Sequence, residues 1–293
     1  MKYITSIFFI GIIVFFISCG QSTGTKTSVP VKADSMTTSI PKIEPEQGES
    51  SARLTALERA DSIRFDSVLQ EAVRMAAAKQ KDTFSMQYVV TLPDSSGQVD
   101  VDLSSNLFFT KEHPHLVVRR YAGGSIYTNI FFKTGKGLQQ VLASELATVV
   151  HMGDTILDVN GDHLKDFVVN GYSANGCCLK GFSIVYLLRQ DMRSFSEGFH
   201  FINPTFSPKE HMIRGICYGH PGETEMYKYR WNGEAVDTVE YIYYERNDNG
   251  KKTGKIIVSN NEPDRDNHKV LRRLSVMPAE YEKIEGYDWF IGF

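Results

Sequence analysis

The sequence predicts a mainly β fold: an antiparallel sandwich or barrel, or a small irregular propeller-like β domain, with one N-terminal helix. Over residues 83–293, short runs rich in β-branched and aromatic residues alternate with turn signals such as Asn232-Gly233 and Asn249-Gly250. Such runs separated by Asn-Gly or Gly-rich turns are typical of hairpins, and many short strands at this spacing are typical of all-β architectures. Before them, residues 55–82 have helical periodicity.

Residues 1–18 have the features of a signal peptide. Lys2 supplies a positive charge, and a nearly unbroken apolar segment runs from Ile4 to Ile17. That segment is short for a membrane span but suits the apolar core of a secretory signal. It ends with a small residue and then Cys19.

The segment that ends at Cys19 resembles a bacterial lipoprotein signal, although Phe16 stands where Leu is commoner. The resemblance implies that Cys19 becomes the first mature residue and carries a lipid that holds the protein to a membrane. Gly20, not Asp, follows the cysteine. By resemblance to the enterobacterial sorting rule, this implies an outer-membrane lipoprotein, facing either the periplasm or the surface. The alternatives are an ordinary secretory signal with an incidental cysteine and an N-terminal anchor helix.

Residues 19–54 are predicted to be a flexible tether. From Gln21 to Ser51 the chain is rich in Ser, Thr, Pro, Lys and Glu, and it has almost no large apolar residues. Such a segment buries too little apolar surface to offset the entropy lost on ordering. The tether would let the folded part stand away from the membrane.

A helix is predicted over residues 56–80. Thr55 and Glu58 match a capping box, and the positive charge near the end of the segment suits a helix C-terminus. We expect its apolar face to dock on the β domain, with a stalk as the alternative, because an apolar stripe needs a partner. A short helical turn is also predicted near Pro278 to Ile284. The apolar face of the long helix consists of Phe65, Val68, Leu69, Ala72, Val73 and Ala76.

The stretch DVNGDHLKDFVV contains a candidate calcium loop at residues 158–166. Oxygen-bearing side chains stand at its first, third, fifth and ninth positions, and the seventh residue could bind through its carbonyl group. Ca²⁺ prefers such oxygen ligands, whereas Mg²⁺ requires octahedral geometry and Zn²⁺ prefers His or Cys. The alternative is an Asp/Asn turn whose side chains bond backbone groups before a strand. The five candidate ligands are Asp158, Asn160, Asp162, Leu164 and Asp166.

This loop, with the apolar residues 167–169 behind it, resembles the calcium loop of integrin-type FG-GAP and VCBS repeats. In those families the loop joins two strands of one blade, which implies a structural Ca²⁺ ion here. The family's sixth residue is Gly, commonly at positive φ, and this chain has His163 in its place. A non-glycine residue adopts that conformation at a cost, so we expect weaker affinity. No second copy of the loop exists in the sequence, which argues against a regular repeat array.

Three cysteines follow Cys19, namely Cys177, Cys178 and Cys217. Adjacent strand residues point to opposite faces, so at most one of the first two readily reaches Cys217. A disulfide between Cys217 and either partner is one interpretation, and buried thiols are the other.

Two histidine clusters, His113-Pro114-His115 and His220-Pro221-Gly222-Glu223, are candidate ligands or bases, but spacing fixes no partner for them. The sequence has no HExxH motif, P-loop or GxGxxG motif. We therefore predict no catalytic residues.

The net charge of −3 gives no indication of a nucleic-acid-binding surface. The export signal, the β-rich texture and the single loop favour a calcium-stabilised binding module of the cell envelope, with a protein or glycan partner and no enzymatic activity. They resemble envelope lipoproteins that act as inhibitors of, or immunity proteins against, peptidoglycan hydrolases. The alternatives are an envelope hydrolase acting on glycan or peptide, and a structural accessory lipoprotein without a discrete site. The sequence leaves the oligomeric state open.

Overall fold

The computed structural model describes residues 64–79, 81–92, 97–147, 149–173, 176 and 178–293. These residues belong to one compact unit. Among the residues described, no helix has the length and hydropathy needed to cross a bilayer. The predicted signal peptide, Cys19 and the tether lie outside these residues.

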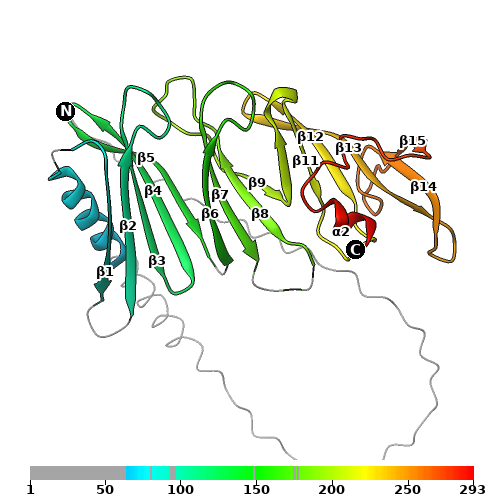
Figure 1. Cartoon of the computed structure of the whole chain (residues 1–293), viewed down its shortest axis with the longest axis horizontal. Coiled ribbons are helices and arrows are strands. Elements are labelled where there is room, and N and C mark those ends of the chain that lie inside the picture. The colour runs from blue at the N-terminus through cyan, green and yellow to red at the C-terminus, as the bar shows by residue number, and fades with distance from the viewer. Residues whose placement is uncertain (1–63, 80, 93–96, 148, 174–175, 177) are drawn as a thin grey trace, which may run out of the picture. The chain divides into compact units, whose positions relative to one another are not determined.

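The mainly β prediction is confirmed, because the chain forms three antiparallel sheets in which strands adjacent in sequence are adjacent in space (Figure 1). Each sheet is open and has an edge strand on either side. The first sheet contains β1 (Phe84–Thr91), β2 (Gln98–Asn106), β3 (His115–Ala122), β4 (Ser125–Thr134) and β5 (Gly137–Leu146). The second contains β6 (Val149–Leu157), β7 (Asp166–Ser173), β8 (Gly181–Tyr186) and β9 (Phe199–Ile202). The third contains β10 (Pro204–Ser207), β11 (Met212–Ile216), β12 (Met226–Asn232), β13 (Ala235–Arg246), β14 (Lys252–Ser259) and β15 (Val270–Leu274).

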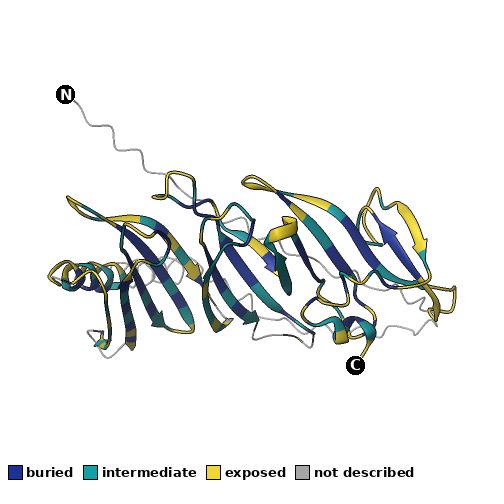
Figure 2. Ribbon diagram, turned by 45° about the horizontal axis from the view of Figure 1, so that its top comes forward, coloured by how far each residue is buried: buried dark blue, intermediate teal, exposed yellow. Residues whose placement is uncertain are grey.

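The second sheet packs between the other two. On β7, Phe167 and Val169 join a cluster with Val117 and Ile130 of the first sheet. The intervening Val168 joins a different cluster with residues of the third sheet. Because alternate residues of a strand point to opposite faces, a strand covered on both faces is apolar without interruption. This explains the continuous run FVV after the aspartate loop, and Figure 2 shows buried residues along strands of all three sheets.

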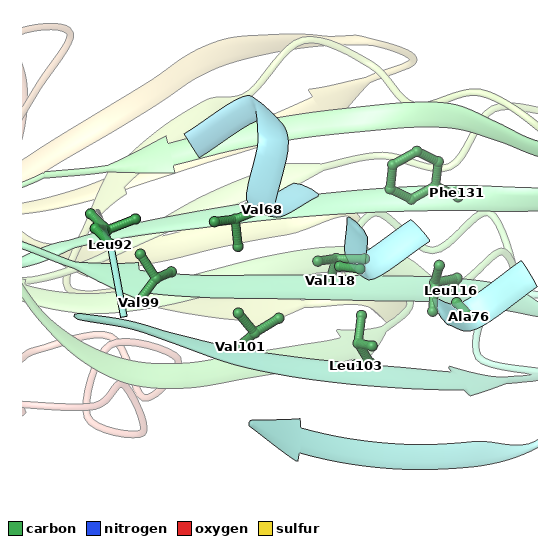
Figure 3. Close-up of a cluster of buried hydrophobic side chains, with 10 residues drawn as sticks. Val68, Ala76, Leu92, Val99, Val101, Leu103, Leu116, Val118 and Phe131 are labelled. Carbon is green, nitrogen blue, oxygen red and sulfur yellow. The ribbon is translucent and has the colours of Figure 1, made fainter. Parts of the chain in front are cut away.

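The N-terminal helix covers the outer face of the first sheet. Among the described residues it spans 64–77, three residues short of the predicted end at 80, while 56–63 and the predicted capping box lie outside them. Val68, Ala72 and Ala76 are buried against Val101 and Leu116 of the sheet (Figure 3). The expected docking of the apolar face is confirmed. The small alanines allow the helix to approach the strands closely.

The C-terminal segment covers the far face of the third sheet. The helical turn predicted at Pro278 to Ile284 is a series of turns instead, with hydrogen bonds from Tyr281 N to Pro278 O (3.0 Å) and from Ile284 N to Tyr281 O (3.3 Å). The short helix α2 (Tyr287–Ile291) begins after it. Tyr281 is fully buried, and its hydroxyl donates to Glu240 Oε1 at 3.0 Å. Packing on the sheet therefore decides the path of this segment.

Candidate functional site

The aspartate loop connects β6 and β7 of the second sheet. Asp158 follows the last residue of β6, and Asp166 is the first residue of β7, where it pairs with Leu157 across the hairpin. The loop thus joins two neighbouring antiparallel strands. The strand that leaves it is buried on both faces, so the loop is anchored in the interior at its exit.

The side chains of the loop turn inward and bond its own backbone. Asp158 Oδ1 accepts from Gly161 N at 2.6 Å, and its Oδ2 accepts from His163 N at 3.0 Å. Asn160 Oδ1 accepts from Asp162 N at 3.1 Å. Asp162 Oδ1 accepts from Leu164 N at 2.8 Å. These bonds curl the loop tightly. The same bonds are those expected of an Asp/Asn turn, which is the alternative interpretation of this stretch.

Asp166 is the most constrained residue of the loop. It is 0% exposed, and its carboxylate accepts from Val159 N at 3.0 Å and from Leu188 N at 2.9 Å. Burial raises the pKa of Asp166 to about 7, and the nearby charges of Asp162 and Asp158 act in the same direction, while the two backbone bonds oppose them. Asp166 therefore fastens the loop to the start of β7 and to the residues that follow β8. Because it is fully buried, its carboxylate is less accessible to a cation from solvent than the other carboxylates of the loop.

His163 occupies the sixth position in the left-handed conformation that favours glycine, with φ of 69°. Its side chain is 95% exposed, so no packing contact holds it in that conformation. The hydrogen bond that His163 N donates to Asp158 does hold it. The cost expected from histidine in place of glycine at this position is therefore backbone strain.

Gly161 has a role that the sequence pattern of the loop did not indicate. It has φ of 86°, and a Cβ atom there would lie 2.3 Å from the carbonyl oxygen of Pro208. Pro208 begins the 3-10 helix η2 (Pro208–Glu210), and His211 after it bonds the carbonyl of Asn160 through Nδ1 at 2.6 Å. The loop is therefore packed against the third sheet as well as anchored in the second.

The donor chemistry of the loop suits calcium better than other ions. Asp158, Asn160 and Asp162 keep lone pairs on oxygen that could hold a cation in addition to the backbone N–H groups. Among the residues that the structure describes, no group of three or more His, Cys, Asp or Glu side chains is placed so that it could hold a metal ion. The carboxylates thus share one loop without forming a finished cage, and calcium binding stays a prediction.

The two described cysteines, Cys178 and Cys217, do not form a disulfide. Cys217 carries a free thiol, while Cys177 lies outside the described residues. Cys178 Sγ lies 3.9 Å from Nδ1 of His220, so it faces the His220 loop. Burial raises the pKa of the Cys217 thiol, which makes it a poor nucleophile.

The cluster His113-Pro114-His115 lies in and beside the core. His115 is 0% exposed, and its ring centroid lies 5.0 Å from that of Phe109 and 5.3 Å from that of Phe132. His113 lies at the edge of the same aromatic group, 5.2 Å from Phe132. His115 is thus a core residue, out of reach of a substrate.

Two arrangements of charged residues have no local sequence signal. His151 Nε2 lies 2.9 Å from Asp154 Oδ1, and the other oxygen of Asp154 accepts from Arg119 of the first sheet. Arg120, the next residue of β3, lies at the floor of a cleft beside the N-terminal helix. Both depend on how the layers pack.

No family model matches the chain, and no curated protein matches it. A Xanthomonas protein related to the type IV secretion system is a solved structure with some similarity. It is 11% identical, with a TM-score of 0.33, over 67% of this chain and 97% of its own. A protein from Lactobacillus plantarum is 10% identical, with a TM-score of 0.21, over 60% of this chain and 68% of its own. Similarity at this level carries no information on function.

Proposed function

We propose that the chain is a calcium-stabilised, β-rich binding module of the cell envelope, held to the outer membrane by a lipid on Cys19. Its partner would be a protein or a glycan of the envelope. The resemblance to inhibitors and immunity proteins that act on peptidoglycan hydrolases supports this class of role. The resemblance of the segment ending at Cys19 to a lipoprotein signal supports the location.

The aspartate loop carries the calcium part of the proposal. Three carboxylates and an amide lie in one short turn, and the left-handed backbone at His163 matches the conformation of the family's glycine. The carboxylates repel one another, and a divalent cation would relieve that repulsion. Because the loop bonds both the second and third sheets, a bound ion would stabilise the junction of two layers. Its role would be structural.

Thermal unfolding of the full-length chain, purified in mild detergent, tests this proposal. With a Kd of about 10⁻³ M, about 10 mM Ca²⁺ would stabilise the folded state by about 1.4 kcal/mol. That corresponds to a rise in Tm of roughly 3–5 °C relative to EGTA. The rise should vanish in Asp158→Ala.

Asp248→Ala is the matched control, since Asp248 lies exposed in the turn between β13 and β14. This variant should keep the full calcium response. Equal midpoints in Ca²⁺ and EGTA for the unmodified chain would refute calcium stabilisation. Incorporation of labelled fatty acid, lost in Cys19→Ser, tests the anchor separately.

A further inference from the structure

A cleft of about 750 Å³ lies between the N-terminal helix and the first sheet. Phe65, Asp66 and Leu69 of the helix form one wall, and Tyr127 of β4 and Glu145 of β5 contribute to the other. Arg120 of β3 also lines it, although this residue is only 4% exposed. The cleft therefore has a buried cation at its floor and carboxylates at its rim.

The guanidinium of Arg120 is incompletely bonded. Nη1 donates to the carbonyl oxygen of Phe65, and Nη2 donates to Asn129 Oδ1 at 2.9 Å. Nε has no hydrogen-bond partner. The guanidinium carbon also lies 5.4 Å from the centroid of the Tyr127 ring. All of these partners are neutral, so none balances the positive charge.

Other arginines of the chain show how a buried guanidinium is normally accommodated. Arg119 pairs with Asp154, and Arg214, which is 5% exposed, pairs with Glu210 at 2.6 Å. Within the part of the chain that the structure describes, no carboxylate forms an ion pair with Arg120 within 4.0 Å. The charge of Asp66 acts on the guanidinium from farther away, but burial outweighs it and lowers the pKa of Arg120. A buried charge without a contacting counter-ion is costly. Its retention at the floor of a cleft is explained if a ligand supplies the anion.

The rim constrains that ligand further. Asp66 and Glu145 both line the cleft, and both are exposed to solvent. Two carboxylates at the entrance would repel a polyanion, whereas the buried guanidinium would repel a simple cation. A molecule that carries both charges would pair with the guanidinium at the floor and with the carboxylates at the rim. Leu69 and Ala143 add apolar surface for small side chains.

We propose that this cleft binds a short zwitterionic peptide, with a carboxylate on Arg120 and an ammonium group near Asp66 and Glu145. This inference deepens the proposed binding function and rests on it. Nη1 and Nη2 of Arg120 each retain one N–H group beyond their bonds to Phe65 and Asn129, and such a fork of two parallel N–H groups suits a carboxylate. The aspartate loop plays no part in the contact, so the calcium test and the peptide test succeed or fail independently.

Trialanine is the probe, and binding to the full-length chain is measured by isothermal titration calorimetry. Two capped forms dissect the charges: trialanine amide lacks the carboxylate, and N-acetyl-trialanine lacks the ammonium group. We expect saturable binding of trialanine and at least tenfold weaker binding of each capped form, because each loses a charge-assisted contact.

Variants test the same assignment from the protein side. Arg120→Met should weaken trialanine binding at least tenfold, and Arg120→Lys should restore part of it, because lysine keeps the charge without the fork. Asp66→Asn and Glu145→Gln change exposed rim residues, so they should weaken binding while leaving the melting temperature unchanged. Glu71→Gln is the control, because it removes an exposed carboxylate of the same helix that does not line the cleft.

The outcomes separate clearly. Loss of binding with either capped peptide and with the rim variants, but not with Glu71→Gln, supports the proposal. Absence of trialanine binding overturns it, and so does equal binding of the amide or of the acetylated form. If Arg120→Met does not fold, the capped peptides and the rim variants still decide the question.

Discussion

Burial of His115 should make the stability of the folded state depend on pH. The ring packs against Phe109 and Phe132 and is 0% exposed. Burial lowers the pKa of His115 from its ordinary 6.5 to about 4. Such a site disfavours the charged imidazolium, so the folded protein holds this histidine neutral.

The sign and size of the effect follow from proton linkage. Above the ordinary pKa of 6.5, both the folded and unfolded states hold His115 neutral. As the pH falls from there towards the folded pKa of about 4, only the unfolded state takes up the proton, so the free energy of unfolding decreases. The full shift corresponds to about 3 kcal/mol, at about 1.36 kcal/mol per pH unit. Between about pH 7.5 and about pH 5 the loss should be about 2 kcal/mol.

Urea unfolding followed by tryptophan fluorescence measures this loss. The test compares the free energy of unfolding of the unmodified chain with that of His115→Leu at about pH 7.5 and about pH 5. The unmodified chain should lose about 2 kcal/mol more than the variant between the two conditions. His163→Gln is the control, because His163 is 95% exposed. It should leave the pH dependence as it is. Equal losses in the unmodified chain and His115→Leu would refute the reasoning.

Three further changes test the loop and the helix by urea unfolding. His163→Gly should stabilise the fold by about 1 kcal/mol, because it relieves the backbone strain at φ of 69°. His163→Ala keeps the strain, and an equal gain there would contradict this explanation. Val68→Ala should cost about 2 kcal/mol, since it empties space between helix and sheet, whereas Gln70→Ala on the exposed side should be neutral. Asp166→Asn should cost about 2 kcal/mol, because an amide cannot accept from both backbone N–H groups. An unchanged midpoint would show that those bonds contribute nothing.

The structural features that the sequence predicted correctly are those that depend on the local spacing of residues. The apolar face of the N-terminal helix docks as expected, because residues such as Val68 and Ala72 recur at the helical spacing. The aspartate loop lies between two strands, and His163 takes the conformation that its position requires. The turn segment near Tyr281 was predicted as helical because its local pattern allows a helix. Its burial on the third sheet decided otherwise.

The charged arrangements were not predictable, because no local pattern states which strand will face which. Arg119 and Arg120 are adjacent in the chain and point to opposite faces of β3. One meets Asp154 of the second sheet, and the other enters the cleft beside the helix. The sequence by itself determined the strands, the docking face of the helix and the composition of the loop. Only the tertiary structure decided that Arg120 would be buried without a contacting counter-ion, because burial and pairing depend on the stacking of layers formed by distant segments.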